Sequence, residues 1–126
     1  MIEKEFIPYE QALALKELGF DEPCFGYFEP NKKFEYLNWE TFKDFPYLAK
    51  NSEWQDLYGA PTFSQAFRFF REKYKIRFII QSSMSDLGEY FKVIFPNGEQ
   101  RNVSYNTYEE AELACLIKLI EIVKNQ

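Results

Sequence analysis

Aromatic side chains constrain the fold of this chain more than any other feature. Fourteen Phe, nine Tyr and two Trp make up 20% of its 126 residues. Because aromatic rings are large, rigid and costly to leave in water, most of them must pack against one another. A domain of this length buries about two thirds of the surface that its unfolded chain exposes. We therefore expect a single domain, residues 1–126, with an aromatic core and with some of the remaining rings on a contact surface.

Residues 8–18 are predicted to form the first helix, since they are rich in strong helix formers and open with a proline. Gly19 follows, and glycine readily adopts the left-handed conformation that ends many helices. Phe20 is placed to contact Leu15, which is typical of a Schellman ending.

A β-hairpin is predicted next. Two aromatic-rich stretches, 24–28 and 33–39, flank residues 29–32, which have Pro and Asn at the central positions of a turn. Residues 40–61 are the least regular part of the chain, although they carry several aromatic side chains. A structureless loop of this length is unusual in a compact domain, so we expect one or two short helical turns here, one of them starting at Ser52.

Two capping boxes frame the second half of the chain. The first, Thr62 to Gln65, predicts a helix that runs through about Lys75, and the second, Thr107 to Glu110, predicts a helix that runs nearly to the end. Three strands of an antiparallel meander are predicted between these helices, at residues 76–82, 89–95 and 99–105, with a polar loop at 83–88 and a turn at 96–98.

Both of these helices have apolar faces. One face of the first helix carries Phe63, Ala66, Phe67, Phe70 and Tyr74. Apolar residues cover more than half the circumference of the last helix, which implies burial against the sheet and against another helix or a partner chain. The sequence therefore leaves open whether the chain forms a homo-oligomer. The order of elements predicts a two-layer α+β fold, in which an antiparallel sheet (hairpin plus three-stranded meander) packs against three main helices.

The chain lacks the residues that several kinds of catalysis require. The chain has no histidine, which removes Ser/His and Cys/His dyads, HExxH zinc sites and the commonest general base. It also has no GxGxxG or P-loop pattern. Cys24 and Cys115 stand alone without CxxC spacing, so we expect two buried free thiols. We predict a protein that is not an enzyme and that needs no cofactor or metal; a carboxylate-based enzyme is a further alternative that no motif supports.

The charge and the hydropathy pattern bear on location and partners. The N-terminal residues include acids and no apolar run, and no apolar stretch approaches the roughly 20 residues that a membrane span requires. We expect a cytoplasmic protein without a membrane partner. The net charge is −5, and residues 1–61 hold 12 acidic and 6 basic side chains, which opposes nonspecific nucleic-acid binding by the whole molecule.

The main candidate for binding is a basic run at residues 68–77, which holds five basic side chains and one acidic one. Arg68, Arg71 and Lys75 fall on one side of the predicted helix, beside its aromatic face. We call these three residues the basic stripe, and Arg77 follows it. Arginine suits bidentate contacts, so this region could hold phosphates or an acidic partner. The alternative is a solvated helix face that pairs with the acidic first half.

Four aromatic residues are further candidates, namely Phe69, Trp39, Trp54 and Tyr58. Tyr and Trp are enriched at binding hot spots, but they are equally suited to a core. Phe69 lies off the core face of its helix, so it either packs under residues 40–61 or contacts a partner.

Three stretches resemble a family of small uncharacterised proteins that phages and prophages of gut anaerobes encode. These stretches are residues 7–20 (IPYEQALALKELGF), 60–74 (APTFSQAFRFFREKY) and 108–116 (YEEAELACL). The resemblance implies a phage context inside a bacterial host and brings no known activity. It leads to the hypothesis of an accessory protein that binds a protein partner through an aromatic-rich surface.

The alternative hypothesis is nucleic-acid binding through the basic helix at 62–75. The predicted order of helix, three strands and helix over residues 62–124 is also that of double-stranded-RNA-binding domains. Such domains begin their last helix with lysines, whereas this helix begins with Glu109, Glu110 and Glu112, which would repel phosphate. Protein binding is therefore the leading hypothesis.

Overall fold

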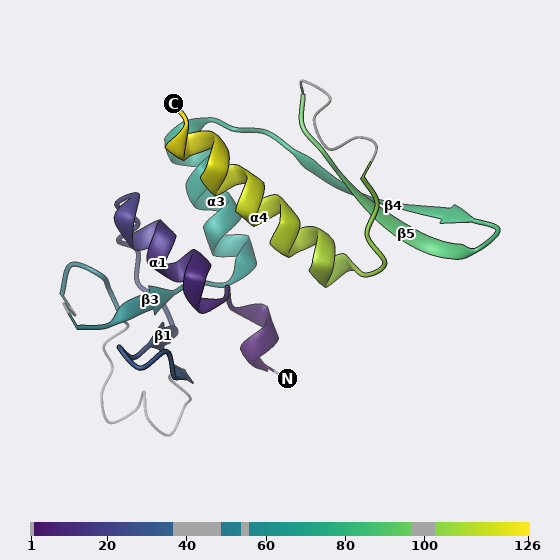
Figure 1. The fold of residues 1–126 in the computed structure, drawn as a ribbon. Helices are drawn as coiled ribbons and strands as arrows, with labels where there is room; N and C mark the ends of the chain where they lie inside the picture. The colour runs from purple at the N-terminus through teal and green to yellow at the C-terminus, as the bar shows by residue number, and fades with distance from the viewer. Residues whose placement is uncertain (1, 37–48, 54–55, 97–102) are drawn as a thin grey trace. The chain divides into compact units, whose positions relative to one another are not determined.

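A computed structural model describes residues 2–36, 49–53, 56–96 and 103–126 (Figure 1). The described residues form three α-helices and two antiparallel sheets, which confirms the predicted α+β class. The chain divides into two compact units, Met1–Phe67 and Arg68–Gln126, and one helix contributes to both. That the whole chain forms a single domain stays a prediction.

The first unit combines short helices with a three-stranded sheet. Its elements are η1 (Ile2–Glu5), α1 (Tyr9–Glu17), β1 (Gly26–Phe28), β2 (Phe34–Tyr36), β3 (Tyr58–Ala60) and the start of α3 (Phe63–Tyr74). Strand β1 lies in the middle, antiparallel to both β2 and β3. The β1–β2 pair is the predicted hairpin. Strand β3 was not predicted, because three residues that include a glycine give too little pattern to identify a strand.

Helix α1 ends as the sequence predicts. Gly19 has a φ of 90°, and its N–H donates to the carbonyl of Lys16 at 3.1 Å. The N–H of Phe20 donates to the carbonyl of Leu15 at 2.9 Å. These two bonds define a Schellman motif, and the side chains of Leu15 and Phe20 are both buried.

The predicted turn between β1 and β2 is also present. The N–H of Lys32 donates to the carbonyl of Glu29 at 2.8 Å, and the Asn31 side chain accepts from the N–H of Lys33 at 3.1 Å. Lys32 has a φ of 71°, a left-handed conformation that more often requires glycine. Within residues 40–61, the described part shows a hydrogen-bonded turn at 51–53 rather than a helix, and residues 40–48 and 54–55 lie outside the described ranges.

Aromatic rings fill the centre of the first unit. Phe34 lies 5.2 Å from Phe6 and 5.3 Å from Phe28 between ring centroids, and Phe28 makes an edge contact with Tyr9 at 5.6 Å. A Cβ atom at Gly26 would come within 2.8 Å of the Phe6 ring, so a larger residue here would force this ring to shift. The predicted aromatic packing is thus confirmed here.

Both predicted helix caps are present, with one difference. Thr62 accepts from the N–H of Gln65 at 3.2 Å, and Thr107 accepts from the N–H of Glu110 at 3.1 Å. The Gln65 side chain does not form the reciprocal bond of the capping box, so that part of the prediction was wrong. Its amide nitrogen instead donates to the carbonyl of Pro23 at 2.8 Å.

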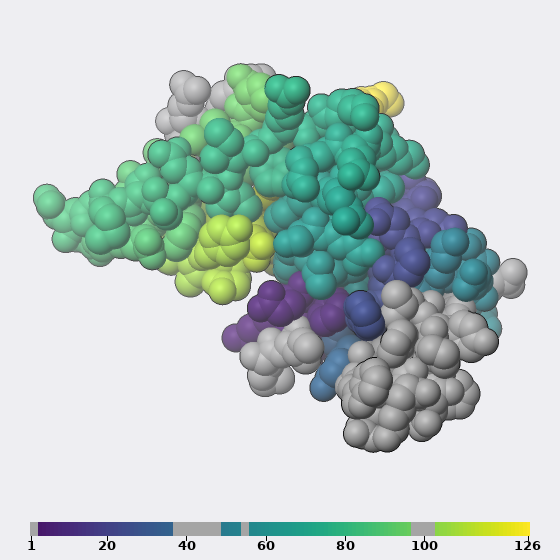
Figure 2. All heavy atoms as spheres, turned by 180° about the vertical axis from the view of Figure 1, so that it is seen from behind, coloured from purple at the N-terminus to yellow at the C-terminus, as the bar shows by residue number. Residues whose placement is uncertain are grey.

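The second unit is a hairpin packed against a long helix. Its elements are the remainder of α3, β4 (Ile79–Ser85), β5 (Gly88–Ile94) and α4 (Tyr108–Lys124). Helix α4 packs against both strands, and the hairpin projects beyond the first turn of α4 (Figure 1). Seen from behind, the hairpin is the green projection at the left (Figure 2).

The strand boundaries differ from those predicted. Strand β4 begins at Ile79 rather than residue 76 and continues to Ser85, so the predicted polar loop at 83–88 shrinks to a two-residue turn at Asp86 and Leu87. This hairpin projects into solvent, and a strand with little burial needs no apolar alternation. Its polar residues were therefore mistaken for a loop.

The third predicted strand, at residues 99–105, is described only from Val103 onward. Tyr105 forms an isolated antiparallel bridge with Phe91, and residues 97–102, which include part of the predicted 96–98 turn, lie outside the described ranges. In the described residues the meander therefore consists of two strands and one bridge.

The core of the second unit lies along α4. Six residues of this helix are buried, namely Ala111, Cys115, Leu116, Leu119, Ile120 and Val123. The wide apolar arc predicted for this helix is confirmed. The predicted core face of α3 is confirmed too, with four of its five residues buried and Tyr74 half-buried. No helix in the described ranges is both long and apolar enough to span a membrane.

Candidate functional site

The end of α3 places the predicted basic residues in different surroundings. Arg68, Arg71, Lys75 and Arg77 are all exposed. Arg71 and Arg77 line a pocket of about 550 Å³, whereas Arg68 and Lys75 do not. The structure thus brings two of the four predicted cations together at one cavity.

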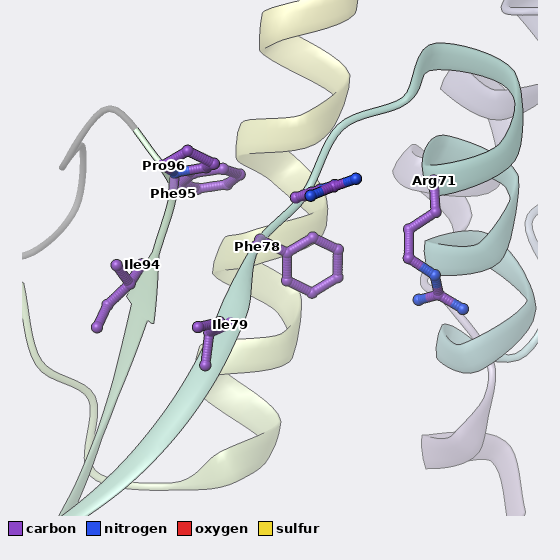
Figure 3. A pocket seen from close by; sticks show the side chains of 7 residues that line it. Arg71, Phe78, Ile79, Ile94, Phe95 and Pro96 are labelled. Atoms are coloured by element: carbon purple, nitrogen blue, oxygen red, sulfur yellow. The ribbon is translucent and has the colours of Figure 1, made fainter.

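The wall of this pocket is apolar. It is formed by residues from the start of β4 and the end of β5, namely Phe78, Ile79, Ile94, Phe95 and Pro96. Ile79 and Ile94 are direct register partners, and the rings of Phe78 and Phe95 lie 6.3 Å apart. Figure 3 shows Arg71 reaching from α3 toward the side where Phe78 and Ile79 lie. We call the seven lining residues the arginine pocket.

The end of α3 explains how Arg77 reaches this pocket. Lys75 has a φ of 59°, which ends the helix after Tyr74. The extended residues 76–78 then lead into β4 at Ile79. Arg71, one turn before the helix end, and Arg77, just before the strand, are thereby placed on the same cavity.

The two guanidinium groups keep their charges available. Among the described residues, neither Arg71 nor Arg77 has an ion-pair or hydrogen-bond partner. Ile79 is 61% exposed although it is apolar, while Phe95, which also lines the pocket, is buried. An occupant that has both an anionic and an apolar group would therefore pair a charge and cover an exposed hydrophobic surface.

The two described aromatic candidates, Phe69 and Tyr58, do not line the arginine pocket. Phe69 is only 7% exposed and makes edge contacts with Phe70 at 5.3 Å and Tyr74 at 5.8 Å, so it is a packing residue rather than an exposed contact residue. Tyr58 belongs to the first unit, where it is half-buried on β3 and makes an edge contact with Tyr9. Trp39 and Trp54 lie outside the described ranges.

The apolar wall of the pocket was not among the predicted site residues. Phe78 and Ile79 were predicted on one strand and Ile94 and Phe95 on the next, but the sequence pattern does not align the two strands. The register of a hairpin follows from its turn, and the predicted loop at 83–88 was four residues too long. A two-residue turn at Asp86 and Leu87 would have placed Ile79 opposite Ile94.

Neither thiol offers reactive chemistry. Cys24 and Cys115 are free and buried, which confirms that prediction. Burial raises the pKa of each thiol to about 12, and the nearby carboxylates of Glu22 and Glu112 add to the respective shifts. A protonated, inaccessible thiol is a poor nucleophile and a poor metal ligand. The described part of the chain also holds no group of three or more carboxylate or thiol side chains that could bind a metal ion.

In comparisons with known proteins, no protein-family model, no curated protein and no solved structure matches this chain.

Proposed function

We propose that this chain acts by binding a protein partner, and that the arginine pocket receives a partner segment with a carboxylate next to an apolar side chain. The observation that carries the proposal is the pair of guanidinium groups, Arg71 and Arg77, on a cavity whose other lining residues are all apolar.

The chemistry of the two parts of the pocket is complementary to such a segment. Hydrogen bonds between arginine and a carboxylate are charge-assisted and are roughly twice as strong as neutral ones. The exposed side chain of Ile79, next to Ile94, would lose water contact beneath an apolar group. The cavity of about 550 Å³ also lies in the usual size range of ligand sites.

Nucleic-acid binding remains the second hypothesis, and one feature weakens it. A phosphate backbone is bound by several cations spaced along a surface, and an apolar wall adds nothing to that contact. If nucleic acid were the ligand, Arg68 and Lys75 should matter as much as the pocket arginines. The resemblance to phage-encoded proteins adds the expectation that the partner is a phage or host protein in a bacterial cytoplasm.

Fluorescently labelled peptides provide the test. One set carries an aspartate beside a phenylalanine, a second replaces the aspartate by asparagine, and a third replaces the phenylalanine by serine. We expect fluorescence anisotropy to show binding of the first set and clearly weaker binding of the other two, since each control removes one of the two contacts.

Charge-matched double variants show where binding occurs. The variant with Arg71→Gln and Arg77→Gln should lose about tenfold or more in affinity, which is the scale expected for lost charged hydrogen bonds. The variant with Arg68→Gln and Lys75→Gln removes the same charge outside the pocket and should bind nearly as the wild type. Equal weakening by both variants, with steep salt dependence and binding of oligonucleotides instead of peptides, would support the nucleic-acid hypothesis and reject this proposal.

A further inference from the structure

Strand β4 forms an open edge of its sheet. It pairs with β5 on one side, and no strand or bridge pairs with its other side among the described residues. The opposite edge of the hairpin differs, because Phe91 of β5 is bridged there by Tyr105. An open strand edge offers unpaired N–H and C=O groups to another strand.

The bridge to Tyr105 identifies which backbone groups of β4 point outward. The N–H of Phe91 donates to Tyr105 at 2.9 Å, and its carbonyl accepts from Tyr105 at 2.8 Å, so both groups point away from β4. Ser82 is the register partner of Phe91, and the two therefore form a non-hydrogen-bonded pair. The backbone groups of Ser82 consequently point to the open edge. By alternation along the strand, those of Ile80 and Met84 do so as well.

This edge lacks the usual protection against strand pairing. Natural edge strands are commonly short, or carry lysine, proline or a bulge. Strand β4 is seven residues long, contains no charged residue and no proline, and pairs with β5 without a bulge. Met84 on this strand is 74% exposed. The strand is thus chemically suited to add a further strand.

We propose that a second copy of this chain occupies the edge, with the two β4 strands antiparallel about a twofold axis at Ser82. In this register Ser82 lies opposite its own counterpart, and Ile80 lies opposite Met84 of the second copy. Each of these positions exchanges both backbone hydrogen bonds with its opposite residue. The exposed Met84 side chain gains an apolar partner, and no like charges face each other.

The same geometry explains why a second copy fits better than an open-ended stack of strands. Pairing of two β4 strands uses the open edge of both copies. The far side of each β5 is already engaged by Tyr105 at Phe91, so the sheet has no equivalent edge left at that position. The twofold axis therefore closes the assembly as a dimer, which is the commonest symmetry of homo-oligomers.

Charge reversal at the axis tests the proposal. We expect the wild type to reach twice the single-chain mass with rising concentration in sedimentation equilibrium. Ser82→Lys and Ser82→Glu should each be monomeric, because identical charges meet at the axis, and an equimolar mixture of the two should restore the dimer. Gln81→Lys is the matched control, since residue 81 lies opposite Ser83 of the second copy and no two lysines face each other.

Cross-linking tests the register directly. Opposite residues of a hydrogen-bonded pair have Cα atoms about 5.5 Å apart, within the range of a disulfide. Ser82→Cys should therefore form a covalent dimer on mild oxidation, while the two native thiols are buried and do not compete. Met84→Cys is a control at another exposed position of β4, whose two copies would lie about 13 Å apart along the strands.

Three results would overturn the proposal. One is a wild type that stays monomeric throughout the concentration series. Another is a dimer that persists in both charged variants. The third is a mixture of the lysine and glutamate variants that remains monomeric although each variant retains the helical circular dichroism of the wild type.

Discussion

The side chain of Asn51 connects the end of helix α1 to strand β3: its nitrogen donates to the carbonyl of Phe20 at 2.8 Å, and its oxygen accepts from the N–H of Gly59 at 2.8 Å. Phe20 and Gly59 are distant from each other in the sequence, and neither of the two hydrogen bonds lies within a helix or strand. Because both backbone groups lie in a partly buried region, Asn51 satisfies polar groups that would otherwise lose water without compensation.

We expect Asn51→Ala to lower the free energy of unfolding by about 1–3 kcal/mol, the cost of leaving buried partners unsatisfied. Asn51→Asp keeps the acceptor for Gly59 but places a carboxylate oxygen against the carbonyl oxygen of Phe20, so it should also lower the free energy of unfolding at neutral pH. Urea midpoints measure both effects. The control is Glu53→Ala at an exposed neighbour whose hydrogen bond to the carbonyl of Lys50 uses the backbone N–H, and it should change stability by less than about 0.5 kcal/mol.

Helix α4 provides a prediction about the core of the second unit. Leu116 is fully buried and Ile120 is nearly so, whereas Ile117 between them is 46% exposed. Leu116→Ala and Ile120→Ala should each cost about 2–5 kcal/mol, which is the range for large-to-small core changes. Ile117→Ala on the same helix should cost less than about 1 kcal/mol. A similar loss at all three positions would show that the exposed face of α4 is also packed in solution.

Local signals predicted the helices of this chain well. The ending at Gly19 and Phe20 and the caps at Thr62 and Thr107 each depend on residues within one helical turn, so neighbouring sequence suffices to identify them. The sheets depend on longer-range pairing. Strand β3 is too short to show a pattern, and its partner in the sheet, β1, lies far from it in the sequence, with Phe28 opposite Tyr58 and Gly26 opposite Ala60.

The candidate site shows the same division between local and long-range information. The basic run at 68–77 was evident from composition, but whether each cation faces a pocket depends on where α3 stops and how β4 pairs. Arg71 and Arg77 share the arginine pocket only because Lys75 ends the helix and Ile79 aligns with Ile94. Neither event follows from charge or hydrophobic periodicity.

The buried thiols predict how stability changes at alkaline pH. The pKa of each thiol is about 12 in the folded chain, above the value of about 8.5 for an exposed cysteine. Below about pH 8.5 both states keep the proton, and the contribution of the thiols to stability is fully present. Between about pH 9 and 12 the unfolded chain releases these protons first, so the free energy of unfolding should fall as pH rises.

Urea titrations at a series of pH values check this expectation. The slope attributable to each thiol should approach about 1.4 kcal/mol per pH unit. Cys115→Ala should flatten the alkaline loss relative to the wild type, whatever its effect at pH 7. Tyrosines whose pKa is raised by burial, such as Tyr108, act in the same direction, and the cysteine variants separate the two contributions. An unchanged slope in both Cys24→Ala and Cys115→Ala would contradict the burial of the thiols.

Lys75 provides the final prediction, because it combines an unusual backbone conformation with membership of the basic stripe. Its φ of 59° places a side chain where a left-handed conformation costs about 1–2 kcal/mol for any residue with a Cβ. Glycine removes that cost and loses part of the gain to the entropy of the unfolded chain. We therefore expect Lys75→Gly to raise the free energy of unfolding by about 0.5–1 kcal/mol, whereas Lys75→Ala retains the Cβ and should give no gain.

The same variants bear on binding. Lys75 does not line the arginine pocket, so both should leave the affinity for acidic peptides unchanged. Loss of peptide binding in Lys75→Ala, with stability intact, would mean that the ligand extends beyond the pocket along the basic stripe. A destabilised Lys75→Gly would instead show that the lysine side chain supports the end of α3 through contacts that outweigh its backbone strain.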